Sequence, residues 1–449
     1  MRVLVCGSTG CVGAAVVHAL RSRGHKVVEG ARAALDGRAT MHVDFMQPRT
    51  PQAWAERLRA TPVDAIVNCV GILIPSHGQR FERVHARGPI ELFEGAALAG
   101  VRRIVQVSAL GVGAAADDTP YLRSKQQADD ALAALPLDWA VLRPSLVYGP
   151  RSQSAALFAT LASLPVISLP GRGEQRVQPI HVYELAEAIA RLVEQPGELR
   201  AVHELGGPNE LSYREMLARY RAALGLGDAL WLPLPMPLMR ATASLAEALP
   251  QTVLCGDTIR LLERGSVPSS NAAAGLLGRA PSTMAHGLAI TVPEPFIDLR
   301  ASLSPGLDLA LRASLAFMWL YTALISLWLP HESGVLRLLA RCGFDGEAGV
   351  AVMVASCVLN IVLGTLTLLR PSSRLYALQC AAVIGYTATA AFNMPELTID
   401  HCGPLAKNLP VLALVVLLWM AQRPAPHAGD GRARVHTKPL RGATPLHSQ

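Results

Sequence analysis

Four apolar segments follow one another closely in the last third of the chain. Three carry no charged residue and contain 17, 22 and 20 residues, at positions 313–329, 348–369 and 375–394. About 20 apolar residues span the hydrocarbon of a bilayer, so these segments predict transmembrane helices. The fourth, at 409–422, has 14 residues and extends further only if Lys407 snorkels. Burial inside a soluble domain is the disfavoured alternative, because the chain has no other domain large enough to cover these helices.

Charges around these segments predict their orientation. Nine cations lie before the first apolar segment, between the second and the third, or after the fourth: Arg300, Arg312, Arg370, Arg374, Arg423, Arg432, Arg434, Lys438 and Arg441. The other two loops carry Arg337, Arg341 and Lys407, together with five acidic residues. Because cytoplasmic loops are enriched in Lys and Arg, we expect four spans in a bacterial-type inner membrane, with both termini in the cytoplasm. Residues 424–449 are polar and contain Pro and Gly, so we expect a disordered basic tail there.

Bulk composition narrows the class of function. The net charge is +7, but the first 300 residues contain no basic cluster, so we expect no nucleic-acid partner. The eight cysteines form no C-x-x-C pair and no metal-ligand spacing. We therefore expect reduced, buried thiols and no metal site.

The chain begins with an apolar strand at residues 2–6, a glycine-rich turn and a helix at 12–23. This is the context that a dinucleotide-binding turn requires, because glycine lets the backbone approach a pyrophosphate at the helix N-terminus. A signal peptide is the alternative, but the glycines interrupt its apolar core. The residues expected to contact the cofactor here are Gly7, Thr9, Gly10, Cys11, Val12 and Gly13.

The second predicted strand, at residues 26–29, indicates which cofactor is bound. A carboxylate for the ribose hydroxyls is expected near Ala31, and none is present there. Arg32 is instead placed to bind a 2′-phosphate, which favours NADP(H) over NAD(H). Two alternatives stay open: Arg32 is an ordinary solvated loop residue, or the strand ends early enough for Glu29 to bind the ribose.

Strands and helices alternate up to about residue 230. Further strands are predicted at 41–43, 65–69, 103–107 and 140–143, with helices at 81–99 and around Tyr121. This alternation predicts an α/β fold with a doubly wound parallel sheet, whose ligands bind at the carboxyl ends of the strands. The residues expected at that edge are Asp44, Val70, Gly71, Ser108 and Tyr121.

Tyr121 and Lys125 stand four residues apart, so on a helix they share one face. The chain has only four lysines among its 41 basic residues. Burial and neighbours tune an ammonium, whereas a guanidinium stays charged. The choice of lysine at position 125 therefore indicates chemistry that an arginine would not supply.

These motifs, with LRPSLVYGP at 142–150, resemble the extended and atypical branches of the short-chain dehydrogenase/reductase superfamily. IVNCVGIL at 66–73, FERVHARGP at 81–89 and VQVSALGV at 105–112 resemble more narrowly the group that contains the NADPH-binding accessory subunit of respiratory complex I. The resemblance implies that Tyr121 is the general acid or base and that Ser108 hydrogen-bonds the same substrate oxygen. It also implies that Lys125 holds the nicotinamide ribose and lowers the tyrosine pKa. His85 stands where the family often has Asn, which weakens the proton relay.

The membrane segment resembles DoxX-like domains through RASLAFMWLYTALISLWLP at 312–330 and GPLAKNLPVL at 403–412. Asn360, Gln379, Asn393 and the run Asp400-His401-Cys402 either line a site or bond one helix to another. Between the two parts, the stretch LWLPLPMPLM from residue 230 either docks on a bilayer or packs on its own sheet. We expect Arg172, Arg176 and His181 either to meet an anionic ligand or to be ordinary surface and core residues.

The expected domains are a nucleotide-binding unit at 1–230, its extension at 231–300, a membrane module at 301–423 and the tail. The leading hypothesis is a membrane-anchored NAD(P)H-dependent oxidoreductase acting on an apolar carbonyl or quinone-like substrate from the bilayer. The first alternative is an inert NADPH-binding scaffold or assembly factor for a respiratory membrane complex. The second is an NAD-dependent epimerase or dehydratase acting on a nucleotide sugar.

Overall fold

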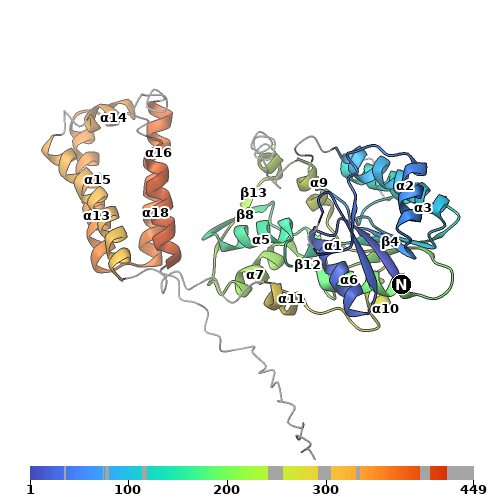
Figure 1. The fold of residues 1–449 in the computed structure, drawn as a ribbon. Helices are drawn as coiled ribbons and strands as arrows, with labels where there is room; N and C mark the ends of the chain where they lie inside the picture. The colour runs from blue at the N-terminus through green and yellow to red at the C-terminus, as the bar shows by residue number, and fades with distance from the viewer. Residues whose placement is uncertain are drawn as a thin grey trace, which may run out of the picture.

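The computed structural model describes residues 1–34, 37–73, 75, 80–113, 119–240, 256–291, 305–329, 334–394 and 405–421. Asp400, His401, Cys402 and the expected basic tail lie outside the described residues. The predicted α/β fold is confirmed for the first part of the chain, and the second part is helical (Figure 1).

A seven-stranded parallel sheet forms the centre of the first part, in the order β11-β6-β5-β4-β1-β2-β3. Its strands are β1 (Arg2–Cys6), β2 (Lys26–Ala31), β3 (Thr40–His42), β4 (Ala65–Asn68), β5 (Arg103–Val107), β6 (Asp138–Pro144) and β11 (Arg200–Leu205). The strand order reverses between β1 and β4, which is the switch point where such sheets bind ligands.

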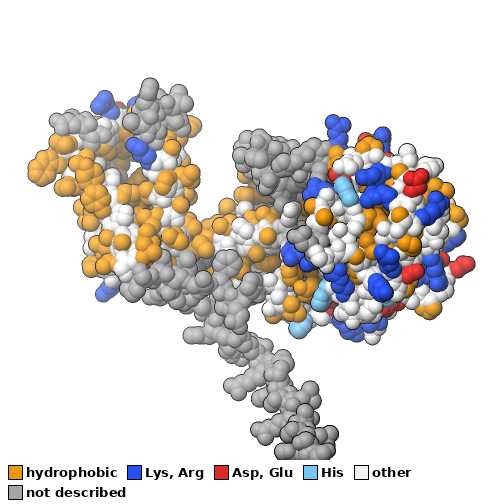
Figure 2. Space-filling view, viewed as in Figure 1, with side chains coloured by type: hydrophobic (Ala, Val, Ile, Leu, Met, Phe, Trp, Pro, Cys, Tyr) orange, Lys and Arg blue, Asp and Glu red, His pale blue; other side chains and the backbone are white. Residues whose placement is uncertain are grey.

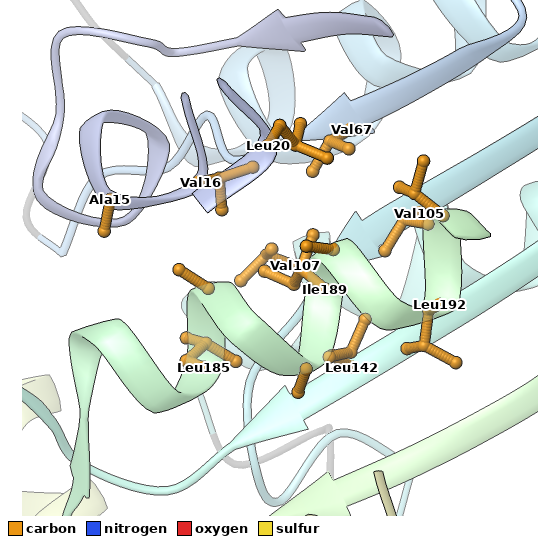
Figure 3. Close-up of a cluster of buried hydrophobic side chains, with 14 of the residues drawn as sticks. Ala15, Val16, Leu20, Val67, Val105, Val107, Leu142, Leu185, Ile189 and Leu192 are labelled. Carbon is orange, nitrogen blue, oxygen red and sulfur yellow. The ribbon is translucent and has the colours of Figure 1, made fainter. Parts of the chain in front are cut away.

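Helices cover both faces of this sheet, so both faces of each central strand are apolar. On one face, α1 (Cys11–Ser22) and α6 (Val182–Glu194) pack Leu20 and Ile189 toward Val67 and Val105 (Figure 3). The other face carries α2 (Pro51–Ala60), α3 (Gly88–Ala99) and α4 (Pro120–Ala133). This sandwich fixes the carboxyl ends of the strands at one edge.

A smaller lobe follows the sheet. It contains α5 (Gln153–Ser163), β8 (Val166–Pro170), α7 (Tyr213–Ala223), β13 (Leu230–Leu234), α9 (Gly256–Arg264), α11 (Met284–Thr291) and the two-residue strands β7 (Val147–Tyr148), β9 (Arg176–Val177), β10 (Ile180–His181) and β12 (Leu211–Ser212). The short helix α10 (Ala273–Leu277) instead packs on α6 and joins the core of the large sheet. β13 pairs in parallel with β8, so the first half of LWLPLPMPLM packs on its own lobe. Leu230 and Leu232 nevertheless point outward and are 59% and 45% exposed.

The second part is a helical bundle formed by α13 (Pro305–Trp328), α14 (Val335–Arg341), α15 (Gly346–Leu369), α16 (Ser373–Asn393) and α18 (Asn408–Ala421). Among the described residues, three segments are long and apolar enough to cross a membrane: Gly306–Trp328, Gly346–Leu369 and Ser373–Asn393. Figure 2 shows their outer surface covered by hydrophobic side chains. α18 has 14 residues and is shorter. The first of these helices starts earlier than predicted, so Arg312 lies inside it.

Candidate functional site

The glycine turn connects β1 to α1 in a conformation that only glycine adopts easily. Gly7 has φ +75°, and the N–H groups of Gly7 and Ser8 donate to the Gly30 carbonyl at 2.9 and 3.2 Å. A Cβ on Gly13 would lie 2.1 Å from the Gly7 carbonyl oxygen, so the helix can pass this close only with glycine there.

The start of α1 fits a pyrophosphate. Its N-cap is Gly10, which has no side chain to cap the helix, and its first turn holds no acidic residue. The first N–H groups of the helix therefore remain available to an anion. Thr9 is exposed at this turn, while the Cys11 thiol donates to the Pro150 carbonyl at 3.4 Å. Burial raises the pKa of Cys11 to about 11, which keeps it a thiol.

The end of β2 presents a cation and no free carboxylate. β2 extends to Ala31, so Glu29 lies inside the strand and not at its end. Its carboxylate is buried and paired with Arg21 at 2.8 Å and Arg38 at 3.4 Å. Arg32 follows the strand and is exposed. Asp44, at the end of β3, accepts from the Met46 N–H at 3.0 Å in a local turn.

Tyr121 and Lys125 lie on one face of α4, as predicted from their spacing. The Lys125 Nζ is 5.8 Å from the centroid of the Tyr121 ring and donates to the Val107 carbonyl at 3.2 Å. A Cβ on Gly71 would lie 3.6 Å from the same Nζ. Val70, its neighbour, packs against Gly7. The structure thus brings the pair to the ends of β4 and β5, beside the glycine turn.

His85 supports this arrangement from a π-helical segment, η1 (Glu82–Arg87). Its Nε2 accepts from the Ile72 N–H at 2.9 Å, and its Nδ1 lies 3.1 Å from the Ser124 hydroxyl. Because Ser124 donates to the Tyr121 carbonyl, we assign the imidazole proton to Nδ1. Burial, and secondly the charge of Lys125, lower the pKa of His85 to about 2. His85 therefore stays neutral and holds both the loop after β4 and the start of α4.

Asp129 is a buried carboxylate of this site that the sequence analysis missed. It stands one turn beyond Lys125 on α4, is 3% exposed and accepts from the Ser108 hydroxyl at 2.7 Å. Arg143 donates to the same oxygen at 3.3 Å, and the other carboxylate oxygen has no partner in the structure. The Ser108 hydroxyl therefore already donates its hydrogen bond to Asp129. The family resemblance implied instead that Ser108 hydrogen-bonds the substrate oxygen. The extension of the four-residue spacing from Tyr121 to Asp129 was the available signal.

Burial controls the protonation of the central pair. It raises the pKa of Tyr121 to about 12 and lowers the pKa of Lys125 to about 8, against an opposing attraction from Asp129. The expected lowering of the phenol pKa is therefore not a property of the protein alone, because desolvation outweighs the nearby ammonium. A protonated phenol is the form that donates to a substrate oxygen during reduction.

The other predicted polar residues lie elsewhere. His181 caps α6 through the Tyr183 N–H and contacts the Thr291 hydroxyl at 2.9 Å, while Arg176 forms an exposed ion pair with Glu210. Arg172 is exposed. The described residues contain no cluster of His, Cys, Asp or Glu that would hold a metal ion.

The predicted polar residues of the bundle are mostly bonded within it. Gln379 accepts from the Trp319 indole at 3.1 Å and donates to the Thr367 hydroxyl at 2.7 Å. Asn393 donates to the carbonyl one turn before it. Asn360 is buried, and its side-chain oxygen has no partner in the structure.

Two protein families match this chain. Residues 3–205 match the NAD dependent epimerase/dehydratase family, and residues 316–416 match the DoxX-like family. An uncharacterized protein of Mycobacterium bovis is 25% identical over 247 residues, which are 55% of this chain but only 26% of that relative. The mitochondrial NADH-ubiquinone oxidoreductase 40 kDa subunit of Neurospora crassa is 23% identical over 258 residues, covering 51% of this chain and 67% of the subunit.

A solved structure shares the fold of the first part. The NADPH-dependent quinone oxidoreductase QOR2 of Escherichia coli, complexed with NADPH, has a TM-score of 0.51 and 18% identity, over 64% of this chain and 99% of its own. Residues 3–205 therefore carry an NAD(P)-binding domain of the epimerase and short-chain dehydrogenase type, and residues 316–416 belong to a DoxX-like membrane domain.

Proposed function

We propose that this chain is a membrane-anchored, NADPH-preferring oxidoreductase that reduces an apolar carbonyl or quinone-like substrate drawn from the bilayer. The observation that carries the proposal is the buried Lys125 ammonium beside Tyr121, next to Gly71 and the glycine turn. A structural lysine at this position would leave the cost of burying its charge unexplained. Apolar helices long enough to cross a membrane support a substrate that partitions into lipid.

Each residue of the site has a proposed role. The turn from Gly7 to Gly13 binds the pyrophosphate, Arg32 binds a 2′-phosphate, and Lys125 binds the ribose hydroxyls. The bound cofactor supplies a hydride to the substrate. Tyr121 gives the proton from its hydroxyl to the substrate oxygen, and His85 and Asp129 hold Tyr121 and Lys125 in place. Ser108, whose proton goes to Asp129, acts as a hydrogen-bond acceptor toward the substrate side.

The nucleotide-binding site and the membrane domain are consistent with one orientation of the chain in the membrane. We propose four spans with both termini in the cytoplasm of a bacterial-type inner membrane. Arg370, at the end of α15, and Arg374, in the first turn of α16, are in line with the enrichment of cations on the cytoplasmic side. NADPH and reduced thiols are available in that compartment.

The test of the activity is Tyr121→Phe in the purified full chain in detergent. With NADPH and a panel of quinones and aldehydes, the wild type should oxidise NADPH, and the variant should lose about 10²-fold or more of the rate. NADPH binding should remain, because the phenol oxygen is the only atom removed. Tyr183→Phe is the matched control, since Tyr183 is 43% exposed on α6. Equal rates in both variants would contradict the role of Tyr121.

The cofactor preference has its own test. NADPH should bind more tightly than NADH, and Arg32→Ala should remove the difference while NADH affinity stays the same. Arg172→Ala, also an exposed arginine of this part of the chain, is the matched control. Equal affinities for the two cofactors in the wild type would overturn the assignment.

A redox-inert scaffold for a respiratory membrane complex is the second candidate. Two observations favour it: the hydrogen bond that the Ser108 hydroxyl donates to Asp129, and the likeness to a subunit of NADH-ubiquinone oxidoreductase. Tight NADPH binding without turnover on any quinone or aldehyde, together with co-purification of a membrane complex, would support this candidate. An NAD-dependent epimerase or dehydratase is the third, which the matching family's name suggests. Retention of NAD and conversion of a nucleotide sugar would support that candidate.

A further inference from the structure

An ion pair lies inside the first membrane-length helix. Asp308 and Arg312 stand one turn apart on α13, within the segment Gly306–Trp328, and Arg312 Nη2 donates to Asp308. Their side chains are only 23% and 18% exposed. The Arg312 Nε is fully buried and has no hydrogen-bond partner among the residues that the structure describes. Charged groups within membrane helices are costly and mark functional positions more often than structural ones.

A second unpartnered donor lies beside this pair. Tyr376, on α16, is completely buried, and its hydroxyl has no hydrogen-bond partner within the described part of the chain. Leu311, the residue before Arg312, and Leu315 share an apolar cluster with Tyr376. One turn deeper the neighbouring polar side chain, Gln379, is fully bonded. Among the described residues of the bundle, Arg312 Nε and the Tyr376 hydroxyl are the buried side-chain donors without a partner, whereas the unpartnered atom of Asn360 is an acceptor.

The depth of this level matches lipid head groups. Arg312 precedes Trp328 by 16 residues, which is about 24 Å of helix at 1.5 Å per residue. A hydrocarbon core of about 30 Å then places Arg312 near the boundary with the phosphates. α15 ends and α16 begins at the same end of the bundle, where Arg370 and Arg374 are exposed. Among the described residues at this end, Arg312, Arg370 and Arg374 outnumber the one aspartate, Asp308.

We infer that Arg312 and Tyr376, with Arg370 and Arg374 at the rim, form a binding site for the phosphate of an anionic membrane lipid. Both buried groups are donors, so the ligand must bring acceptor oxygens, and the surplus of arginines selects a negative charge. Asp308 orients the guanidinium and leaves Nε directed elsewhere. The site is independent of the nucleotide-binding part and of any turnover there.

The test is lipid binding to the purified full chain, measured by native mass spectrometry. After delipidation, the wild type should retain phosphatidylglycerol at least about fivefold better than phosphatidylcholine, as expected for one or two added cation contacts of about 1 kcal/mol each. Tyr376→Phe and Arg312→Gln should each remove most of that preference. Tyr321→Phe is the matched control, because Tyr321 is 51% exposed on the same helix α13 as Arg312.

Two outcomes would overturn the inference. One is an unchanged preference for phosphatidylglycerol in Tyr376→Phe, which removes only the unpartnered hydroxyl and should fold. The other is displacement of the lipid by millimolar inorganic phosphate with the same dependence on Tyr376, which would assign the site to a soluble anion. Loss of binding in Tyr376→Phe, with Tyr321→Phe unchanged and phosphate ineffective, would support the lipid assignment.

Discussion

Replacing Lys125 by methionine should make the nucleotide-binding part more stable while it removes function. Lys125 is 5% exposed, and burial lowers its pKa to about 8 from 10.5. That difference corresponds to about 3 kcal/mol of unfavourable free energy for the charged folded form. Methionine also loses the hydrogen bond to the Val107 carbonyl, at a cost of about 1 kcal/mol. The expected net gain at pH 7 is therefore about 2 kcal/mol in the free energy of unfolding.

The pH dependence gives this prediction its sign. Between pH 8 and 10.5 the unfolded chain keeps the Lys125 proton and the folded chain releases it. The unfolded state then binds more protons, so the lysine contributes a rise of stability with pH across this window. The advantage of Lys125→Met should consequently shrink from pH 8 upward and vanish near about pH 10, above which only the loss of the hydrogen bond to Val107 remains.

Hydrogen exchange of the β5 and α4 amides in the full chain measures this effect locally. The difference between wild type and variant isolates Lys125 from the cysteines and tyrosines that titrate in the same range. Lys26→Met is the matched control, because Lys26 is exposed at the start of β2. Faster exchange of Lys125→Met at pH 7, or a gain that does not depend on pH, would refute a desolvated ammonium at this position.

Two further changes test the packing on which the account rests. Gly13→Ala would place a Cβ 2.1 Å from the Gly7 carbonyl oxygen, so we expect the free energy of unfolding to fall by about 1–3 kcal/mol and NADPH to bind more weakly. Thermal unfolding and NADPH titration measure the two effects. Gly275→Ala, whose Cβ would meet no atom within 4 Å, is the control and should be neutral. Gln379→Leu leaves the Trp319 indole without its acceptor and should lower the unfolding temperature of the bundle in detergent, at about 1 kcal/mol, whereas unchanged stability would show that the bond contributes nothing.

The parallel, doubly wound sheet was predictable because each central strand is buried on both faces and therefore forms a continuous apolar run between helices. Strand boundaries were less predictable. β2 runs two residues beyond its predicted end, because Gly30 and Ala31 pair with β1 and β3. β13 was not predicted as a strand, since Pro233 argues against one. The proline is tolerated because β13 pairs only with β8 in a two-stranded sheet, where it is an edge strand.

The part of the candidate site that depends on the spacing of residues along one helix was predictable. The separation of Tyr121 and Lys125 sufficed to place them together on α4. The contact of His85 with Ile72 depends on a π-helical turn and on the loop after β4, which no local pattern encodes. The pKa values of the pair depend on how deeply the sheet edge is covered, a property of the tertiary structure.

The most direct test of the central claim is hydrogen exchange of the full chain with and without saturating NADPH. The account requires that one nucleotide contacts both the glycine turn and the helix carrying Tyr121 and Lys125. It predicts slower exchange at residues 7–13 and also at residues 119–125. Protection of the turn without any protection of α4 would contradict it, because the phenol and the ammonium would then lie away from the bound cofactor.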